Sequence, residues 1–130
     1  MQTRHVVVWL DHSEAHVIHF NRDASEVEHI KAASKPHLHV KAQVNAGSGR
    51  TAENRAYLDD VAAAVKSAEE ILVVGPGSEK TVLFKHLLKH HAPVADKVVS
   101  VETVDHPSDG QLLAFARKYF LAADRMRLGV

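Results

Sequence analysis

Hydrophobic residues in the first quarter of the chain form short segments with the length of β-strands. Residues 6–10 are continuously apolar, which predicts a central strand covered on both faces. Residues 15–20 and 26–30 predict two more strands. The segment 26–30 is short and charged, which is typical of an edge strand. The polar connections at 11–14 and 21–25 are too short for a crossover, so we expect a three-stranded antiparallel meander.

The second half of the chain alternates helical and strand patterns. Apolar residues at helical spacing predict a helix over about residues 51–68: Leu58, Val61, Ala62 and Val65. Residues 71–74 and 97–101 predict two buried strands, and a helix opens near Ser78 between them. Ser108-Asp109-Gly110-Gln111 predicts a capping box at the start of a final helix.

The predicted order of elements is β-β-β-α-β-α-β-α. Strand–helix–strand units require parallel neighbours with right-handed crossovers. A three-stranded antiparallel meander joined to two parallel strands is an α/β, ribonuclease H-like arrangement, and we expect one domain over residues 1–130. A flavodoxin-like sheet would need a helix between the first two strands, where the chain has no room for one.

Composition narrows the function without identifying it. The chain has 130 residues, with 16 Lys and Arg against 16 Asp and Glu, and this neutral balance argues against a dedicated duplex-DNA binder. The absence of cysteine excludes disulfides and thiolate metal sites. The chain contains no apolar run of about 18 residues, so we predict no membrane span. The apolar stretch near the start is too short for a signal peptide, so we expect a cytoplasmic protein.

One segment departs from this neutral balance. Between His29 and Ala52 the chain has no acidic residue, and we expect residues 32–50 to form a basic, flexible loop. Cationic side chains there can neutralise phosphates, and the histidines can stack on exposed bases. The predicted RNA-binding residues are Lys31, Lys35, His37, His39, Lys41, Arg50 and Arg55. A solvated loop without a partner is the alternative.

A second candidate is the turn at Gly75-Pro76-Gly77-Ser78, which ends a strand and opens a helix. The helix N-terminus is a natural site for an anion, and the predicted anion-binding residues are Gly75, Gly77, Ser78 and Lys80. Glu79 in the first turn already complements the helix dipole, which weakens the case for a phosphate. A tight turn that needs glycine dihedrals explains the same residues.

Three carboxylates suggest an enzymatic alternative, a divalent-metal nuclease that uses Asp11, Asp105 and Asp109. Two hard cations would need several converging carboxylates to clamp a scissile phosphate. The set is incomplete, because the strand over residues 71–74 ends in Gly-Pro-Gly where a further ligand is expected.

The eleven histidines raise the question of zinc. Two pairs can share a face: His37 with His39 if that segment is extended, and His86 with His90 if theirs is helical. His16 and His19 point to opposite faces of a strand because their spacing is odd. The chain lacks a four-ligand spacing, so we predict neither a metal site nor a cofactor. Pairing of the exposed edge strand near Val27 with a second copy is a further possibility.

Three segments resemble the middle domain of eukaryotic and archaeal class-one peptide-chain release factors and their relative Pelota. They are residues 6–15, residues 71–80 with their Gly-Pro-Gly and following lysine, and the basic residues 35–55. The chain is also similar to small bacterial proteins called translational machinery proteins, which share Asp-His-Pro-Ser-Asp-Gly-Gln at 105–111 and Ala116-Arg117.

The resemblance implies a non-enzymatic protein of the translation machinery that associates with the ribosome or structured RNA. Release factors act through a Gly-Gly-Gln loop, and this chain has Ala-Gly-Ser-Gly-Arg at 46–50 instead. Gln43, the glutamine of the basic loop, follows Ala42 rather than two glycines. Peptidyl-tRNA hydrolysis is therefore not implied.

Overall fold

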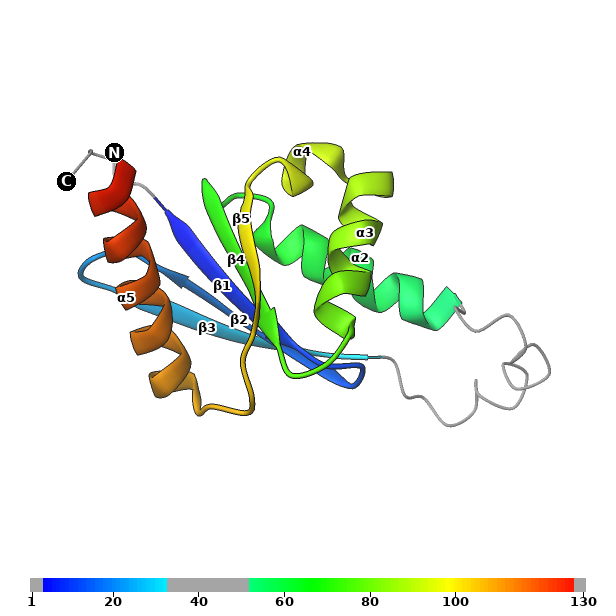
Figure 1. Cartoon of the computed structure of the whole chain (residues 1–130). Coiled ribbons are helices and arrows are strands. Elements are labelled where there is room, and N and C mark those ends of the chain that lie inside the picture. Colours follow the sequence, from blue (N-terminus) through cyan, green and yellow to red (C-terminus); the bar gives the residue numbers. More distant parts are fainter. Residues whose placement is uncertain (1–3, 33–51, 128–130) are drawn as a thin grey trace.

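A mixed five-stranded sheet lies between helices on its two faces in this computed structural model, which describes residues 4–32 and 52–127 (Figure 1). The elements are β1 (His5–Leu10), β2 (Glu14–Phe20), β3 (Ser25–Lys31), α2 (Ala52–Val65), β4 (Glu70–Gly75), α3 (Glu79–His90), α4 (Ala92–Ala95), β5 (Val98–Thr103) and α5 (Asp109–Arg127). The predicted order is confirmed. The short α4, which carries a proline in its first turn, is an addition.

The sheet has the strand order β3-β2-β1-β4-β5. β2 pairs antiparallel with both β1 and β3, whereas β4 pairs parallel with both β1 and β5. This confirms the predicted α/β fold of an antiparallel meander joined to two parallel strands, and it is compatible with the ribonuclease H-like arrangement. The crossover helices α2 and α3 cover one face of the sheet, and α5 covers the other (Figure 1).

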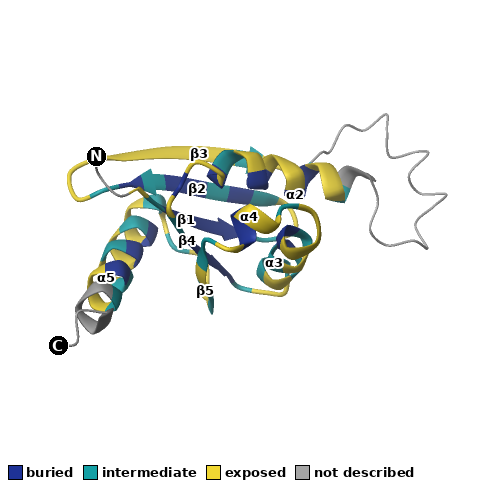
Figure 2. Ribbon diagram, turned by 90° about the horizontal axis from the view of Figure 1, so that it is seen from above, coloured by how far each residue is buried: buried dark blue, intermediate teal, exposed yellow. Residues whose placement is uncertain are grey.

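The continuous apolar run of β1 arises because both faces of the strand are covered. Val6, Val8 and Leu10 join the core beneath α2 and α3. Val7 and Trp9 point the other way, into the core beneath α5. Figure 2 accordingly shows β1 and β4 almost entirely in the colour of buried residues. The two cores explain why neither strand alternates between apolar and polar residues.

β3 is the exposed edge of the sheet, as its charged sequence predicts. Six of its seven residues are exposed, and Val27 keeps 45% of its surface accessible (Figure 2). Arg117 of α5 holds the hairpin that leads into this strand. One guanidinium nitrogen donates to the carbonyl oxygens of Asn21 and Ala24, at 3.1 and 3.3 Å. Pairing of this edge with a second copy stays a prediction.

The ends of two helices follow local rules. The capping box is confirmed: the Gln111 amide donates to Ser108 Oγ at 3.1 Å, and the Ser108 amide donates to Gln111 Oε1 at 2.9 Å. The predicted need for glycine dihedrals before α3 is wrong, because neither Gly75 nor Gly77 adopts a positive φ. Gly75 is required for a different reason: the Leu10 carbonyl of β1 fills the space of a side chain there. Within the described ranges, no helix is long and apolar enough to cross a membrane.

Candidate functional site

The carboxyl ends of β1, β3 and β4 lie at one edge of the sheet. This follows from the pairing. β4 is parallel to β1, and β3 runs in the same direction as β1 because both are antiparallel to β2. Lys31 is the last residue of β3, and Arg55 lies in the first turn of α2; both side chains are exposed. β3 ends and α2 begins at the same end of the molecule (Figure 1). The structure therefore brings together the two ends of the predicted basic segment.

The other five predicted RNA-binding residues lie outside the residues that the structure describes: Lys35, His37, His39, Lys41 and Arg50. Lys31 stands opposite Glu14 in the pairing of β3 with β2. Even so, every ion pair found between residues of the described ranges has a histidine as its basic partner. None of the ion pairs found between described side chains involves Lys31 or Arg55.

The predicted anion-binding turn joins β4 to α3. Ser78 is the N-cap of α3, and its carbonyl oxygen accepts the amides of Thr81 and Val82, each at 3.0 Å. The Ser78 hydroxyl makes no capping hydrogen bond. The Lys80 ammonium folds back and donates to the carbonyl oxygen of Gly77. The lysine thus stabilises the turn that precedes its own helix.

Carboxylates as well as Lys80 lie near this turn. Glu79 stands in the first turn of α3, and its Oε2 is buried without a hydrogen-bond partner. The nearby Tyr57 hydroxyl donates to the Asp11 carbonyl oxygen at 2.9 Å. Burial raises the pKa of Tyr57 far above its ordinary value, and the negative charges of Asp11, Glu79 and Glu14 raise it further. An anion at the turn would face repulsion from the same carboxylates, so anion binding there stays a prediction that the surroundings do not favour.

The three carboxylates of the nuclease alternative occupy different environments. Asp11 Oδ1 accepts the amides of Ser13 and Glu14, at 2.8 and 2.9 Å, and so closes the β1–β2 turn. Asp105 is almost fully exposed, with 95% of its side chain accessible. Among described residues, Asp109 is grouped with histidines, and neither of the other two aspartates joins it. A two-metal centre of these three side chains is therefore not assembled.

Asp109 instead belongs to a cluster with His16 and His29, which we call the α5 anchor. His16 and His29 face each other across β2 and β3, with ring centroids 4.2 Å apart. His16 Nδ1 and His29 Nε2 lie 2.9 and 2.8 Å from different oxygens of Asp109. Burial acts most strongly on the pKa of Asp109 and raises it, but the hydrogen bonds from both histidines outweigh burial and leave the pKa lowered. The cluster fixes the first turn of α5 on the sheet.

A second cluster joins α2 to the end of α3 and consists of Asp59, His86 and His91. His86 Nε2 and His91 Nε2 lie 2.7 and 2.8 Å from the same oxygen, Asp59 Oδ1. The hydrogen bond from His91, followed by that from His86, lowers the pKa of Asp59, which keeps this carboxylate ionised at neutral pH. This set, which we call the α2–α3 triad, brings three potential metal ligands within 4.8 Å of one another.

The shared face that helical spacing predicts for His86 and His90 is confirmed. The two rings do lie side by side, 4.8 Å apart. The nitrogen that meets Asp59 beside His86 nevertheless comes from His91. That residue caps α3 with φ −140° and ψ 56°, so the chain has left helical geometry and its side chain turns back toward α2. Periodicity within one helix cannot locate a ligand beyond the helix end.

The sequence analysis did not predict either cluster, although part of one was within reach. A hairpin that pairs Phe20 with Ser25 also sets His16 opposite His29, so the predicted meander implied that pair. The opposite faces predicted for His16 and His19 are confirmed, since His19 Nε2 donates to the Ala64 carbonyl of α2 at 2.8 Å. Nothing in the local pattern indicated the aspartates, which come from distant helices.

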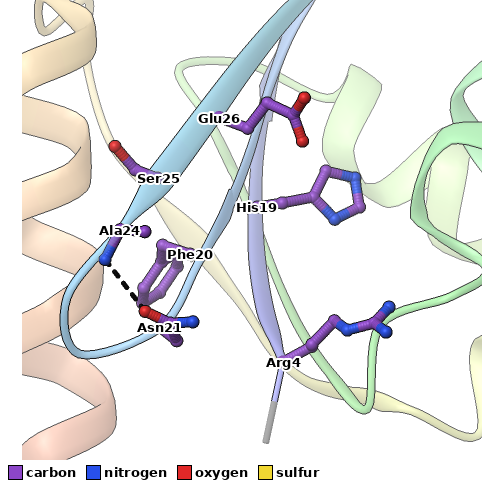
Figure 3. Close-up of a pocket in the computed structure, with 7 residues that line it drawn as sticks. All are labelled: Arg4, His19, Phe20, Asn21, Ala24, Ser25 and Glu26. Atoms are coloured by element: carbon purple, nitrogen blue, oxygen red, sulfur yellow. Dashed lines mark hydrogen bonds between the residues drawn. The ribbon is translucent and has the colours of Figure 1, made fainter. Parts of the chain in front are cut away.

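A shallow pocket lies at the opposite edge of the sheet, beside the β2–β3 hairpin (Figure 3). Its lining residues are Arg4, His19, Phe20, Asn21, Ala24, Ser25 and Glu26. Asn21 Oδ1 accepts the Ala24 amide at 2.9 Å, which closes the hairpin turn (Figure 3). His19 donates its proton to the Ala64 carbonyl oxygen of α2, so His19 and Asn21 both serve the fold.

Solved structures with a similar fold include Pelota, an archaeal translation termination factor and a translation termination-like factor. Pelota from Archaeoglobus fulgidus matches with a TM-score of 0.62, at 14% identity over 91% of this chain and 32% of that protein. The archaeal translation termination factor aRF1 matches with 0.54, at 9% identity over 82% and 31%. Dom34 from S. cerevisiae matches with 0.53, at 12% identity over 78% and 28%. This chain thus spans about a third of the length of these proteins.

No protein-family model matches the chain, and no curated protein matches it by sequence. The structural neighbours support the predicted likeness to release factors and Pelota, and at these identities they establish the fold alone. The likeness to bacterial translational machinery proteins stays a prediction.

Proposed function

We propose that this chain is a non-enzymatic protein of the translation machinery that binds the ribosome or structured RNA through residues 31–55. Its fold is that of Pelota, of the termination factor aRF1, and of Dom34, whose structure is described as that of a translation termination-like factor involved in RNA quality control. In this proposal the chain is a single cytoplasmic domain that corresponds to the middle domain of those proteins.

The observation that carries the proposal is the placement of the acid-free segment. It leaves the sheet at Lys31 and ends where α2 begins at Ala52, one turn before Arg55, and neither Lys31 nor Arg55 is paired with a described carboxylate. Lysine and arginine side chains in such a segment would bind phosphates and release counterions. The proposed phosphate contacts are Lys31, Lys35, Lys41, Arg50 and Arg55, with His37 and His39 as secondary contacts.

Catalysis forms no part of the proposal. Residues 46–50 lack the Gly-Gly-Gln sequence through which release factors act, so ester hydrolysis has no basis here. The nuclease alternative is not favoured either, because Asp11, Asp105 and Asp109 do not converge. The basic segment would act by binding alone.

Co-sedimentation with ribosomes tests the proposal. The full chain is sedimented with purified ribosomes at salt concentrations from about 50 to 300 mM, since phosphate contacts weaken steeply over this range. In the test variant, Lys35, Lys41 and Arg50 are changed to Glu. We expect retention to fall at least tenfold at the lowest salt, while the melting temperature is unchanged.

A matched control separates local contacts from net charge. Arg22, Lys66 and Lys118 are exposed and lie away from the segment, and changing them to Glu gives the same change in charge. This control should be retained like the wild type. Equal retention of the two variants would overturn the proposal. Parallel runs with ribosomal RNA alone show whether the polyanion or the assembled ribosome is the ligand.

A further inference from the structure

In the α2–α3 triad, two imidazole nitrogens point at a single carboxylate oxygen. His86 Nε2 and His91 Nε2 lie 2.7 and 2.8 Å from Asp59 Oδ1. The ring centroids of the two histidines are 5.5 Å apart and the ring planes are tilted by 51°, so the rings converge from different directions. Three donor atoms therefore surround one point between α2 and the end of α3.

These distances are close to those of a metal site. A tetrahedral ion with bonds of about 2.1 Å separates its ligand atoms by roughly 3.4 Å. The three donor atoms already lie within 4.8 Å of one another. Opening each nitrogen–oxygen contact by about 0.6 Å would admit a metal ion of this size, and the exposed carboxylate has room to move. Small changes in side-chain rotamers therefore suffice.

Burial also suits an ion with an open coordination position. The His86 side chain is only 8% exposed, so α3 holds it firmly in place. The side chain of His91 is 32% exposed and that of Asp59 is 51% exposed, so both reach solvent. A water molecule can reach a fourth position there without rearrangement of the core.

The α5 anchor contains the same residue types but lacks this geometry. His16 and His29 approach different oxygens of Asp109, so their nitrogens define two separate points. Each contact there is complete as an ordinary hydrogen bond. Both clusters place their donor atoms within 4.8 Å of one another, but only in the α2–α3 triad do both nitrogens approach one oxygen.

We propose that Asp59, His86 and His91 bind one divalent transition-metal ion, for which zinc is the best fit, with a water molecule as the fourth ligand. Zinc accepts two imidazoles and one carboxylate as ligands, whereas magnesium disfavours the imidazoles. The ion would clamp α2 to the end of α3 and replace the shared hydrogen bonds with metal bonds. Each ring would then carry its proton on Nδ1.

Calorimetric titration of the full chain with Zn²⁺ tests the proposal. The protein must carry no affinity tag and must first be stripped with a chelator, because the eleven histidines make weak binding elsewhere easy to mistake for a site. We expect one ion per chain, with no competition from excess Mg²⁺. Asp59→Asn and His91→Ala, which change exposed side chains, should each weaken binding at least tenfold.

Two control variants decide where the ion sits. His90→Ala removes the neighbouring histidine, and His29→Ala removes an exposed member of the α5 anchor; both should bind Zn²⁺ like the wild type. Saturating Zn²⁺ should also raise the melting temperature of the wild type by several degrees and leave that of His91→Ala unmoved. Undiminished binding by His91→Ala, or a loss of binding in His29→Ala, would overturn the proposal.

Discussion

The carbonyl oxygen of Leu10 occupies the space that a side chain at position 75 would need. Leu10 ends β1 and Gly75 ends the parallel strand β4, so the two backbones meet where both strands leave the sheet. An atom added at Gly75 can be accommodated only by moving one of these backbones, because the obstacle is not a flexible side chain.

Gly75→Ala should therefore lower the free energy of unfolding by roughly 1–3 kcal/mol, the usual cost of overpacking a closely fitted site. Gly77 is the matched control. A Cβ at Gly77 meets nothing within 4 Å and its φ is not positive, so Gly77→Ala should change stability by less than about 0.5 kcal/mol or raise it slightly. Urea unfolding of both variants provides the measurement, and equal losses would contradict the account of Gly75.

The ionised Asp109 should contribute to the free energy of unfolding, and this contribution should be lost at low pH. Burial raises the folded-state pKa of Asp109, but the hydrogen bonds from His16 and His29 outweigh burial and leave this pKa below the ordinary value, so the folded state binds its proton more weakly than the unfolded state. The contribution is complete above the unfolded pKa of about 3.9, and it is lost as pH falls through the lower folded pKa. Glu14 is the other acidic group at this cluster, with its Oε2 3.6 Å from His16 Nε2.

Asp109→Asn should accordingly cost roughly 1 kcal/mol at pH 7, a typical value for partly exposed hydrogen bonds. The difference between wild type and variant should shrink once the pH drops below about 4. Urea unfolding at pH 7, 5, 4 and 3 follows the difference directly. A difference that stays constant down to pH 3 would show that Asp109 does not act through its charge.

Tyr57 should make the fold sensitive to alkali. Burial is the main reason that its folded-state pKa is raised, so above the unfolded pKa of about 10 the unfolded chain loses this proton and the folded chain keeps it. Wild-type stability should decline as pH rises beyond about 10, and Tyr57→Phe should lack this part of the decline.

At pH 7, Tyr57→Phe should cost about 1 kcal/mol, because the Asp11 carbonyl oxygen loses its hydrogen-bond donor. Unfolding measured from pH 8 to 11 compares the two proteins. Tyr119→Phe, which changes a partly exposed tyrosine, serves as the control and should follow the wild-type pH dependence. Identical slopes for wild type and Tyr57→Phe would refute the prediction.

The capping box should carry measurable stability. Ser108→Ala removes the oxygen that accepts the Gln111 amide, and the expected loss is about 1 kcal/mol. Guanidinium unfolding gives the value. Asp109 and Gly110 are left intact by this change, so the anchor should keep its own pH dependence, and a changed acid response would show that the two features are not independent.

The sequence was most informative where structure depends on neighbours in the chain. The unbroken apolar run in β1 predicted a strand covered on both faces, and Ser108 with Gln111 predicted a helix start; both are confirmed. The short connections predicted the antiparallel meander, and that topology already places Lys31 at the edge of the sheet where β1 ends.

Prediction failed where two distant segments must meet. The role of Gly75 depends on the backbone of Leu10, which lies 65 residues earlier in the chain. Helical spacing correctly placed His86 beside His90, but it did not indicate that His91, beyond the last turn, joins His86 at Asp59. Where the chain changes direction after a helix, local periodicity does not indicate which side chain turns toward the neighbouring helix.

The sequence by itself determined the strands, the helices, their order and the acid-free segment between β3 and α2, because hydrophobic periodicity, turn residues and charge are local properties. The tertiary structure alone decided that Asp109 meets His16 and His29, and that Asp59 meets His86 and His91. The first contact arises where α5 packs on one face of the sheet, and the second where α2 and α3 pack together on the other face. Such packing depends on the shape of the whole core rather than on any single segment.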